Sequence, residues 1–201
     1  AFEMPKWKER IMTTLSVFNG YGSIFPWVMI HERGHHKHSD REGDPHSPLK
    51  GFWHAFLTWL REQRYFDEHI DRRVLVTYIR RNFVNDKYYT FLNDNHLAIN
   101  YGTVGLVWLL FGWQVALYGV WFGIWATLMN TSLVTALSHY SWFGYRNFDT
   151  PDNSVNNRVG AILTFGEMLH NNHHRFWKAT NNSQHWSEID ISGWVIKGLK
   201  K

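Results

Sequence analysis

The chain has 201 residues, and its 21 Lys and Arg against 17 Asp and Glu give a formal net charge of +4. It contains no cysteine, which excludes disulfides, thiolate zinc sites and iron–sulfur clusters. The charge is modest and no basic tract is interleaved with aromatic residues, so we expect no nucleic-acid partner. Any metal must be held by histidine, carboxylate or water, and the chain has 13 histidines.

The first half of the chain predicts helices that are short or interrupted. We expect one domain over residues 1–201. Residues 11–30 are moderately apolar but contain Gly20, Gly22 and Pro26, which predicts a kinked or interfacial helix. Turn-forming residues occupy 40–48, and residues 51–60 place bulky apolar side chains at helical spacing, as in an amphipathic helix on a membrane. Residues 67–85 are charged and helical in character.

Residues 95–145 contain no Asp, Glu, Lys or Arg. Helices over 95–113 and 115–138, turning near Gly112, would cross a bilayer twice. Basic residues flank this run on both sides, which by the positive-inside tendency puts both flanks on the cytoplasmic face. Aromatic residues make up 17% of the chain, including 12 Trp, and such rings favour membrane interfaces. We therefore predict an all-α integral membrane fold with a transmembrane hairpin in contact with membrane lipid.

Histidines cluster on both sides of the uncharged run. Residues three and four apart on a helix share a face, so each cluster directs several imidazoles toward one point. A further histidine ends the second predicted crossing, where an ionisable group is costly and usually functional. Sites rich in nitrogen and free of sulfur suit Fe, Zn or Cu, and the number of candidates indicates two ions. The candidate ligands are His31, His35, His36, His139, His170, His173 and His174.

The remaining six histidines are isolated in the sequence. A lone histidine is more often a surface or hydrogen-bonded residue than a ligand, and we assign no function to them. They are His38, His46, His54, His69, His96 and His185.

Several segments resemble the membrane fatty-acid desaturase family, in its delta-9 acyl-CoA and acyl-lipid branch. They are residues 35–48 (HHKHSDREGDPHSP), 138–149 (SHYSWFGYRNFD), 163–174 (LTFGEMLHNNHH) and the tail 188–196 (EIDISGWVI). The resemblance implies a helical membrane fold capped by a cytosolic, histidine-rich di-iron site. It implies an enzyme that uses O2 and two electrons to place a double bond, at the delta-9 position, in a saturated acyl-CoA or acyl-lipid. Ferredoxin or a cytochrome b5 type protein would supply the electrons.

The sequence departs from the family pattern at three places. An earlier box of the form HxxxxH would lie before Ala1, so we expect a partial domain that lacks the N-terminal helices and is inactive and poorly metallated alone. The second box is normally HxxHH, whereas this chain has one residue more. Counting forward from Trp27 gives His31 as the ligand, and counting back from His35 gives Glu32. We favour His31 and keep Glu32 as the alternative.

The third departure is Thr135, which replaces a family Asn thought to hold a metal-bound water. Threonine can still hydrogen-bond such a water. Carboxylates that orient the imidazoles are also expected, and Glu167 and Asp40 are the candidates.

Two other functions fit the same residues. A di-iron centre of this type also supports acyl hydroxylation. The altered second box and Thr135 are compatible with a non-catalytic, lipid-binding relative.

Overall fold

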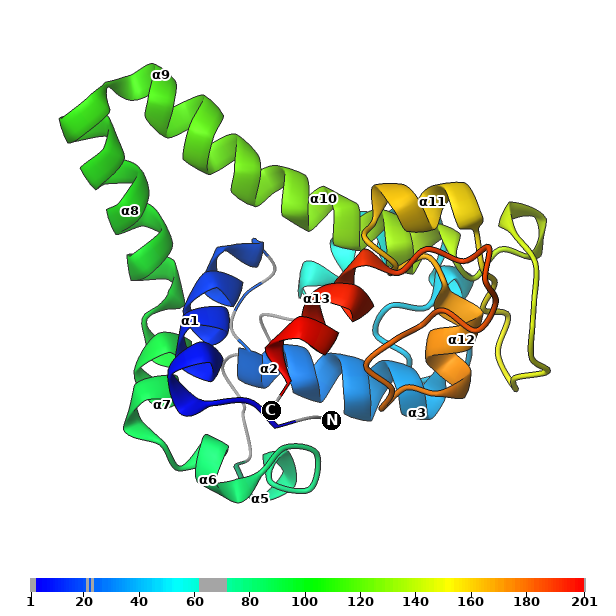
Figure 1. The fold of residues 1–201 in the computed structure, drawn as a ribbon. Coiled ribbons are helices and arrows are strands. Elements are labelled where there is room, and N and C mark those ends of the chain that lie inside the picture. The colour runs from blue at the N-terminus through cyan, green and yellow to red at the C-terminus, as the bar shows by residue number, and fades with distance from the viewer. Residues whose placement is uncertain (1–2, 21, 23, 62–71, 201) are drawn as a thin grey trace. The chain divides into compact units, whose positions relative to one another are not determined.

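A computed structural model of the chain describes residues 3–20, 22, 24–61 and 72–200 (Figure 1). The described residues form helices and no strand, and the one β feature among them is a pair of isolated bridges, from Asn156 to Tyr145 and to Leu169. The predicted all-α class is therefore confirmed. The chain divides into two compact units. Unit 1 comprises Ala1–Glu9, Gly34–Trp59 and Asn130–Lys201, and unit 2 comprises Arg10–Arg33 and Leu60–Met129.

The first apolar segment is broken, as its glycines predict. It forms α1 (Lys6–Ser16), η1 (Val17–Asn19), α2 (Ile24–Val28) and η2 (Met29–His35). Gly20 and Gly22 adopt φ of +80° and +102°, a left-handed backbone that ends a helix and that glycine adopts without strain. Pro26 lies in the first turn of α2, where the missing N–H has no helical partner to lose.

The segment 67–85 is expected to be helical in character, and its described part is helical in two short stretches, while residues 67–71 lie outside the described residues. This region forms α5 (Arg72–Leu75) and α6 (Arg81–Val84), followed by α7 (Lys87–Asp94). The short helices pack apolar side chains from three separate segments into the core of unit 2. The apolar side chains of this segment are therefore explained by burial in a shared core rather than by one amphipathic helix face. That core contains Phe25, Val28, Met29, Leu75, Val84 and Tyr89.

The uncharged run forms two helical segments that meet at Gly112, whose φ is +88°. The first is α8 (His96–Phe111), and the second is continuous through α9 (Trp113–Val115), η5 (Ala116–Trp121) and α10 (Phe122–Leu137). The 25 residues of Trp113–Leu137 are long and apolar enough to cross a membrane. The 16 residues of α8 extend only ~24 Å, less than the ~30 Å hydrocarbon core. The second predicted crossing thus corresponds to a helix that is long enough to span the membrane. The hairpin as a whole stays a prediction.

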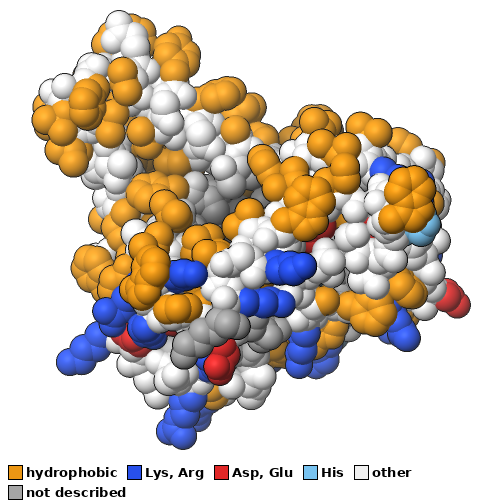
Figure 2. Space-filling view, viewed as in Figure 1, with side chains coloured by type: hydrophobic (Ala, Val, Ile, Leu, Met, Phe, Trp, Pro, Cys, Tyr) orange, Lys and Arg blue, Asp and Glu red, His pale blue; other side chains and the backbone are white. Residues whose placement is uncertain are grey.

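The surface of this segment is apolar. Figure 2 shows hydrophobic side chains crowding α8 and α9. Leu109 is 85% exposed, and Trp108, Phe111 and Trp113 are more than half exposed. A soluble protein rarely leaves so many neighbouring large apolar side chains in water, whereas lipid is a suitable solvent for them.

Unit 1 carries the histidine clusters. It contains α3 (His36–His38), η3 (Pro48–Lys50), η4 (His54–Thr58), η6 (Ser141–Phe143), α11 (Arg158–Leu163), α12 (His170–Arg175) and α13 (Ile191–Leu199). Residues 52–61 are helical except for a turn at Trp59, which confirms the helix predicted over 51–60. Trp59, Ala136 and Leu169 are fully buried and anchor the elements around the histidines.

The turn at Gly112 should lie on the opposite side of the membrane from the start of α8. Since the chain has no cysteine, single cysteines can be introduced by Asp94→Cys and Gln114→Cys, both at exposed positions. In intact cells a membrane-impermeant maleimide should label Gln114→Cys at once and Asp94→Cys only after the membrane is disrupted. Equal labelling of both positions would reject the hairpin.

Candidate metal centre

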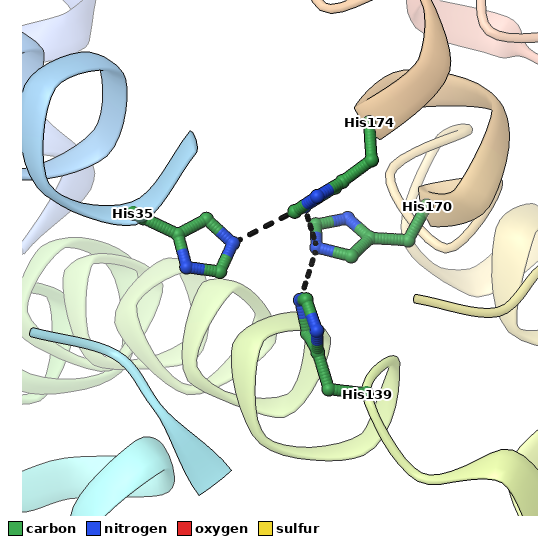
Figure 3. Close-up of side chains that lie close together, drawn as sticks. All are labelled: His35, His139, His170 and His174. Carbon is green, nitrogen blue, oxygen red and sulfur yellow. Dashed lines mark hydrogen bonds between the residues drawn. The ribbon is translucent and has the colours of Figure 1, made fainter. Parts of the chain in front are cut away.

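Four imidazoles of unit 1 converge on one point (Figure 3). His35 ends η2, His139 lies two residues beyond α10, and His170 and His174 are one turn apart on α12. The Nε2 atoms of three pairs are each 3.1 Å apart, namely His35 with His174, His174 with His170, and His170 with His139. His35, His139 and His170 are buried, at most 3% exposed.

The opposite nitrogen of three of these rings bonds to an aspartate. His35 Nδ1 lies 3.0 Å from Asp44 Oδ1, and His139 Nδ1 lies 2.9 Å from Asp40 Oδ2. His174 Nδ1 lies 2.8 Å from Asp152 Oδ2. An ionised carboxylate only accepts hydrogen bonds, so Nδ1 must carry the proton in each pair.

These bonds determine which atoms face inward. Burial raises the pKa of Asp40, but the hydrogen bonds from His139 and from the backbone of Asn153 outweigh it and hold that pKa below its usual value. Bonds from His35 and from the backbone of His46 do the same for Asp44. Both carboxylates are therefore ionised at neutral pH.

Burial and the neighbouring imidazole of His170 lower the pKa of His174 well below its usual value, so this ring is uncharged. An uncharged ring that donates from Nδ1 keeps a lone pair on Nε2. The Nε2 lone pair of His174 faces Nε2 of His35 over 3.1 Å, so a cation between the two atoms would contact both. Imidazole nitrogens bound to one metal ion at ~2.1 Å lie roughly 3.0–3.4 Å apart. The donor set and its spacing therefore fit a metal ion.

A tight turn supplies two of the three carboxylates. Asp40 adopts a left-handed φ of +55°, which aspartate tolerates better than most residues. Its backbone N–H donates to Asp44 Oδ2 over 3.0 Å, and the N–H of His46 donates to Asp44 Oδ1 over 2.9 Å. The turn thereby holds both aspartates beside their histidines through backbone N–H groups.

The two asparagines of α12 face away from the imidazoles and fasten the helix. Asn171 Oδ1 accepts the backbone N–H groups of Asn147 and Phe148, each over 2.9 Å. Asn172 Nδ2 donates to the buried carboxylate of Glu188 over 2.9 Å. In the four-histidine group, only the Nδ1 of His170 finds no hydrogen-bond acceptor among the described residues. The orientation of His170 therefore depends on the packing of α12.

A second pair of imidazoles lies beside the first group. His36 Nε2 and His173 Nε2 are 3.1 Å apart, and the rings of His36 and His174 have centroids 4.9 Å apart. Burial, reinforced by nearby imidazoles, lowers the pKa of His173 to about 4 and that of His36 to about 2. Both rings are uncharged at neutral pH and have a lone pair available for a metal.

Comparisons with known proteins decide the family. Residues 1–190 match the family described as fatty acid desaturase. The chain belongs to the fatty acid desaturase family. This is a family of oxidoreductases that act on acyl chains, and its members are associated with membranes.

Individual desaturases are similar over nearly the whole chain. The sn-1 stearoyl-lipid 9-desaturase of Anabaena variabilis is 34% identical over 200 residues, which cover 100% of this chain and 70% of the relative. Delta-9 acyl-lipid desaturase 2 of Arabidopsis thaliana is 32% identical, with 98% and 62% covered. The acyl-CoA 5-desaturase AL21 of Anemone leveillei is 32% identical, with 100% and 60% covered. The chain thus spans 60% to 70% of the length of these desaturases.

The structure brings six of the seven histidines that the desaturase resemblance singles out into one unit. They are His35, His36, His139, His170, His173 and His174. His31 and its alternative Glu32 lie in unit 2, on η2, where the His31 ring stacks on Trp27 with centroids 4.7 Å apart.

The other three desaturase candidates differ in their surroundings. Asp40 bonds to a histidine of the four-histidine group. Thr135 Oγ1 donates to the backbone oxygens of Ala55 over 2.9 Å and Ser132 over 3.0 Å. Glu167 is exposed and makes no hydrogen bond to an imidazole among the described residues. Their roles at the metal stay predictions.

Sequence reasoning missed Asp44 and Asp152. Asp44 lies inside the segment 35–48 that carries the family resemblance, and its turn Gly43-Asp44-Pro45 was a usable signal. Asp152 is 22 residues from His174, and nothing in its local sequence connects the two.

Removing the aspartate behind His35 should weaken metal binding. In Asp44→Ala the His35 ring loses the bond that aims Nε2 inward, and loss of such a partner typically lowers metal affinity ~10–100-fold. Cobalt(II) titration of the purified protein, followed by visible absorption, measures this change. Asp149→Asn, an exposed aspartate of the same unit, should bind cobalt like the wild type. Equal affinity of Asp44→Ala and wild type would remove Asp44 from the site.

Proposed function

We propose that the protein is a fatty-acyl desaturase that introduces a double bond into a saturated acyl chain at a histidine-ligated di-iron centre. The supporting observation is the convergence of four imidazoles, three of which are oriented by hydrogen bonds from Nδ1 to aspartates. Its occurrence in a chain of the fatty acid desaturase family connects the metal site with acyl-chain oxidation.

A sulfur-free nitrogen donor set suits Fe, Zn or Cu, and the family favours iron among them. One ion would be held by His35, His139, His170 and His174, and the second by His36 and His173 together with His31. Two bound iron ions would supply the O2 chemistry that removes two hydrogens from an unreactive methylene pair. The aspartates keep the rings protonated on Nδ1 and so hold the Nε2 lone pairs ready for the metal.

The substrate and the position of the double bond are finer proposals. The relatives from Anabaena and Arabidopsis are named as 9-desaturases of acyl-lipids, and the Anemone relative is an acyl-CoA 5-desaturase. We favour an acyl-lipid or acyl-CoA and the delta-9 position. Electrons would come from a ferredoxin or a cytochrome b5 type donor. The site would face the cytoplasm, with Trp113–Leu137 crossing the membrane.

The helical geometry of the second box favours His31 over Glu32. Residues five apart on an α-helix point about 140° away from each other. Met29–His35 is instead a π-helix, in which the backbone bonds run from residue i to i+5 and bring such residues onto one face. His31 precedes His36 by five residues, so the π-helix absorbs the additional residue of the box. The usual spacing of i, i+3, i+4 becomes i, i+4, i+5.

Replacing His173 by Ala should abolish the unsaturated product and lower the iron content. The change removes one member of the His36–His173 pair and leaves one ion with too few ligands. The complete protein would be expressed in a host without its own desaturase. Product fatty acids are then analysed by chromatography and mass spectrometry, and iron is measured in the purified protein.

The exposed His185 provides the matched control, and His185→Gln should retain both product and iron. Full activity of His173→Ala would contradict the ligand assignment. A hydroxylated product from the wild type would replace desaturation by hydroxylation at the same centre. About two irons per chain are expected, and none would favour a non-catalytic relative.

The choice between His31 and Glu32 can be tested by comparing His31→Ala with Glu32→Ala. The π-helix predicts that His31→Ala loses about one of two irons, whereas Glu32→Ala keeps both. Metal analysis after desalting measures the difference. The reverse result would show that a carboxylate has taken the place of the imidazole.

A further inference from the structure

The loop of residues 146–154 contacts the four-histidine group through Asp152, and one arginine holds this loop in place. Arg146 Nη1 donates to the backbone oxygens of Asp152 over 2.7 Å and Ser154 over 3.1 Å. Its Nη2 donates to the backbone oxygen of Thr150 over 2.9 Å and to the hydroxyl of the same residue over 3.0 Å. One guanidinium therefore satisfies three backbone carbonyls that converge on it.

The far side of this loop reaches two of the four imidazoles. Asp152 Oδ2 accepts the Nδ1–H of His174. The backbone N–H of the next residue, Asn153, donates over 2.6 Å to Asp40 Oδ2, the oxygen that also accepts from His139. The loop thus supplies the acceptor for one ring and helps to position the acceptor for another.

The loop of residues 146–154 is also anchored to α12. Asn171 Nδ2 donates to Phe148 O over 3.0 Å and to the Thr150 hydroxyl over 3.2 Å. Asn171 holds the first half of the loop and Arg146 holds the second, which contains Asp152. Arg146 itself is an exposed residue, and its bonds to the loop join no imidazole.

We propose that Arg146 is a positioning residue for the four-histidine metal site, where it acts through Asp152 on His174 and through Asn153 on His139. Without a cation, the three converging carbonyls repel one another and are exposed to water, so the loop opens and the acceptors leave their rings. A lysine offers three donors from one point and cannot reproduce the planar fork of a guanidinium. The bonds of the loop lead to His174 and, through Asp40, to His139, and both rings belong to the four-histidine group. This inference rests on the proposed metal centre.

Cobalt(II) binding by the complete, detergent-purified protein tests the proposal. The wild type should bind two ions. Arg146→Gln should weaken one of them ~10–100-fold, the range expected for loss of an outer partner, and leave the other unchanged. The cobalt affinity of Arg146→Lys at this site should lie between those of the wild type and Arg146→Gln. Arg158→Gln, which removes another exposed arginine of unit 1, should bind like the wild type.

A double-mutant cycle separates positioning from general stabilisation. If Arg146 acts mainly through Asp152, Arg146→Gln should weaken cobalt binding less than about threefold further in an Asp152→Ala background. Additive effects, equal weakening of both ions, or no effect of Arg146→Gln would each overturn the role of Arg146. If Arg146→Gln does not fold, as judged by size-exclusion chromatography, Arg146→Lys is measured in the same cycle. A wild type that binds no cobalt would overturn the metal centre itself, and this inference with it.

Discussion

The hydrogen bond from an imidazole Nδ1–H to an aspartate is the interaction on which the site depends. Made three times, by Asp40, Asp44 and Asp152, it fixes both the protonated nitrogen and the direction of the ring. The Nε2 atoms of His35 and His174 then lie 3.1 Å apart, a spacing that suits two atoms bound to one cation. In water such rings would turn away from one another, and the buried hydrogen bonds to the aspartates hold them together in the folded protein.

These aspartates come from only two short segments. The turn that follows α3 carries Asp40 and Asp44, and the loop that follows η6 carries Asp152. The Asn153 N–H bonds to Asp40 and so joins the two segments across 113 residues of sequence. The aspartates behind His35, His139 and His174 therefore belong to one connected network, and a change in either segment affects rings that are held by the other.

The sequence predicted the clustering of the histidines better than the residues that support them. The spacing of His170, His173 and His174 and the family resemblance identified the six imidazoles that the structure gathers in unit 1. Asp152 and Arg146 could not be found because their partners are distant in sequence or are backbone carbonyls, which have no side-chain signature. The helical character expected for 67–85 is found in α5 and α6, but the break between them could not be predicted, since it depends on Leu75 and Val84 packing into a shared core. The breaks at Gly20 and Gly112 could be predicted because glycine adopts positive φ without strain, and both residues have positive φ in the structure.

The π-helix of Met29–His35 also has a consequence for how such proteins change over evolution. One additional codon within an α-helix turns every later side chain by about 100°, which would point His35 and His36 away from their partners. A π-helical turn takes up the additional residue, so the rotation is confined to residues 29–35 and does not reach His36 and the helix that follows. A histidine motif can thus change its length without changing its chemistry. A search that demands the HxxHH spacing at the second box would pass over residues 31–36, although the π-helix offers a way to keep the predicted ligands in register.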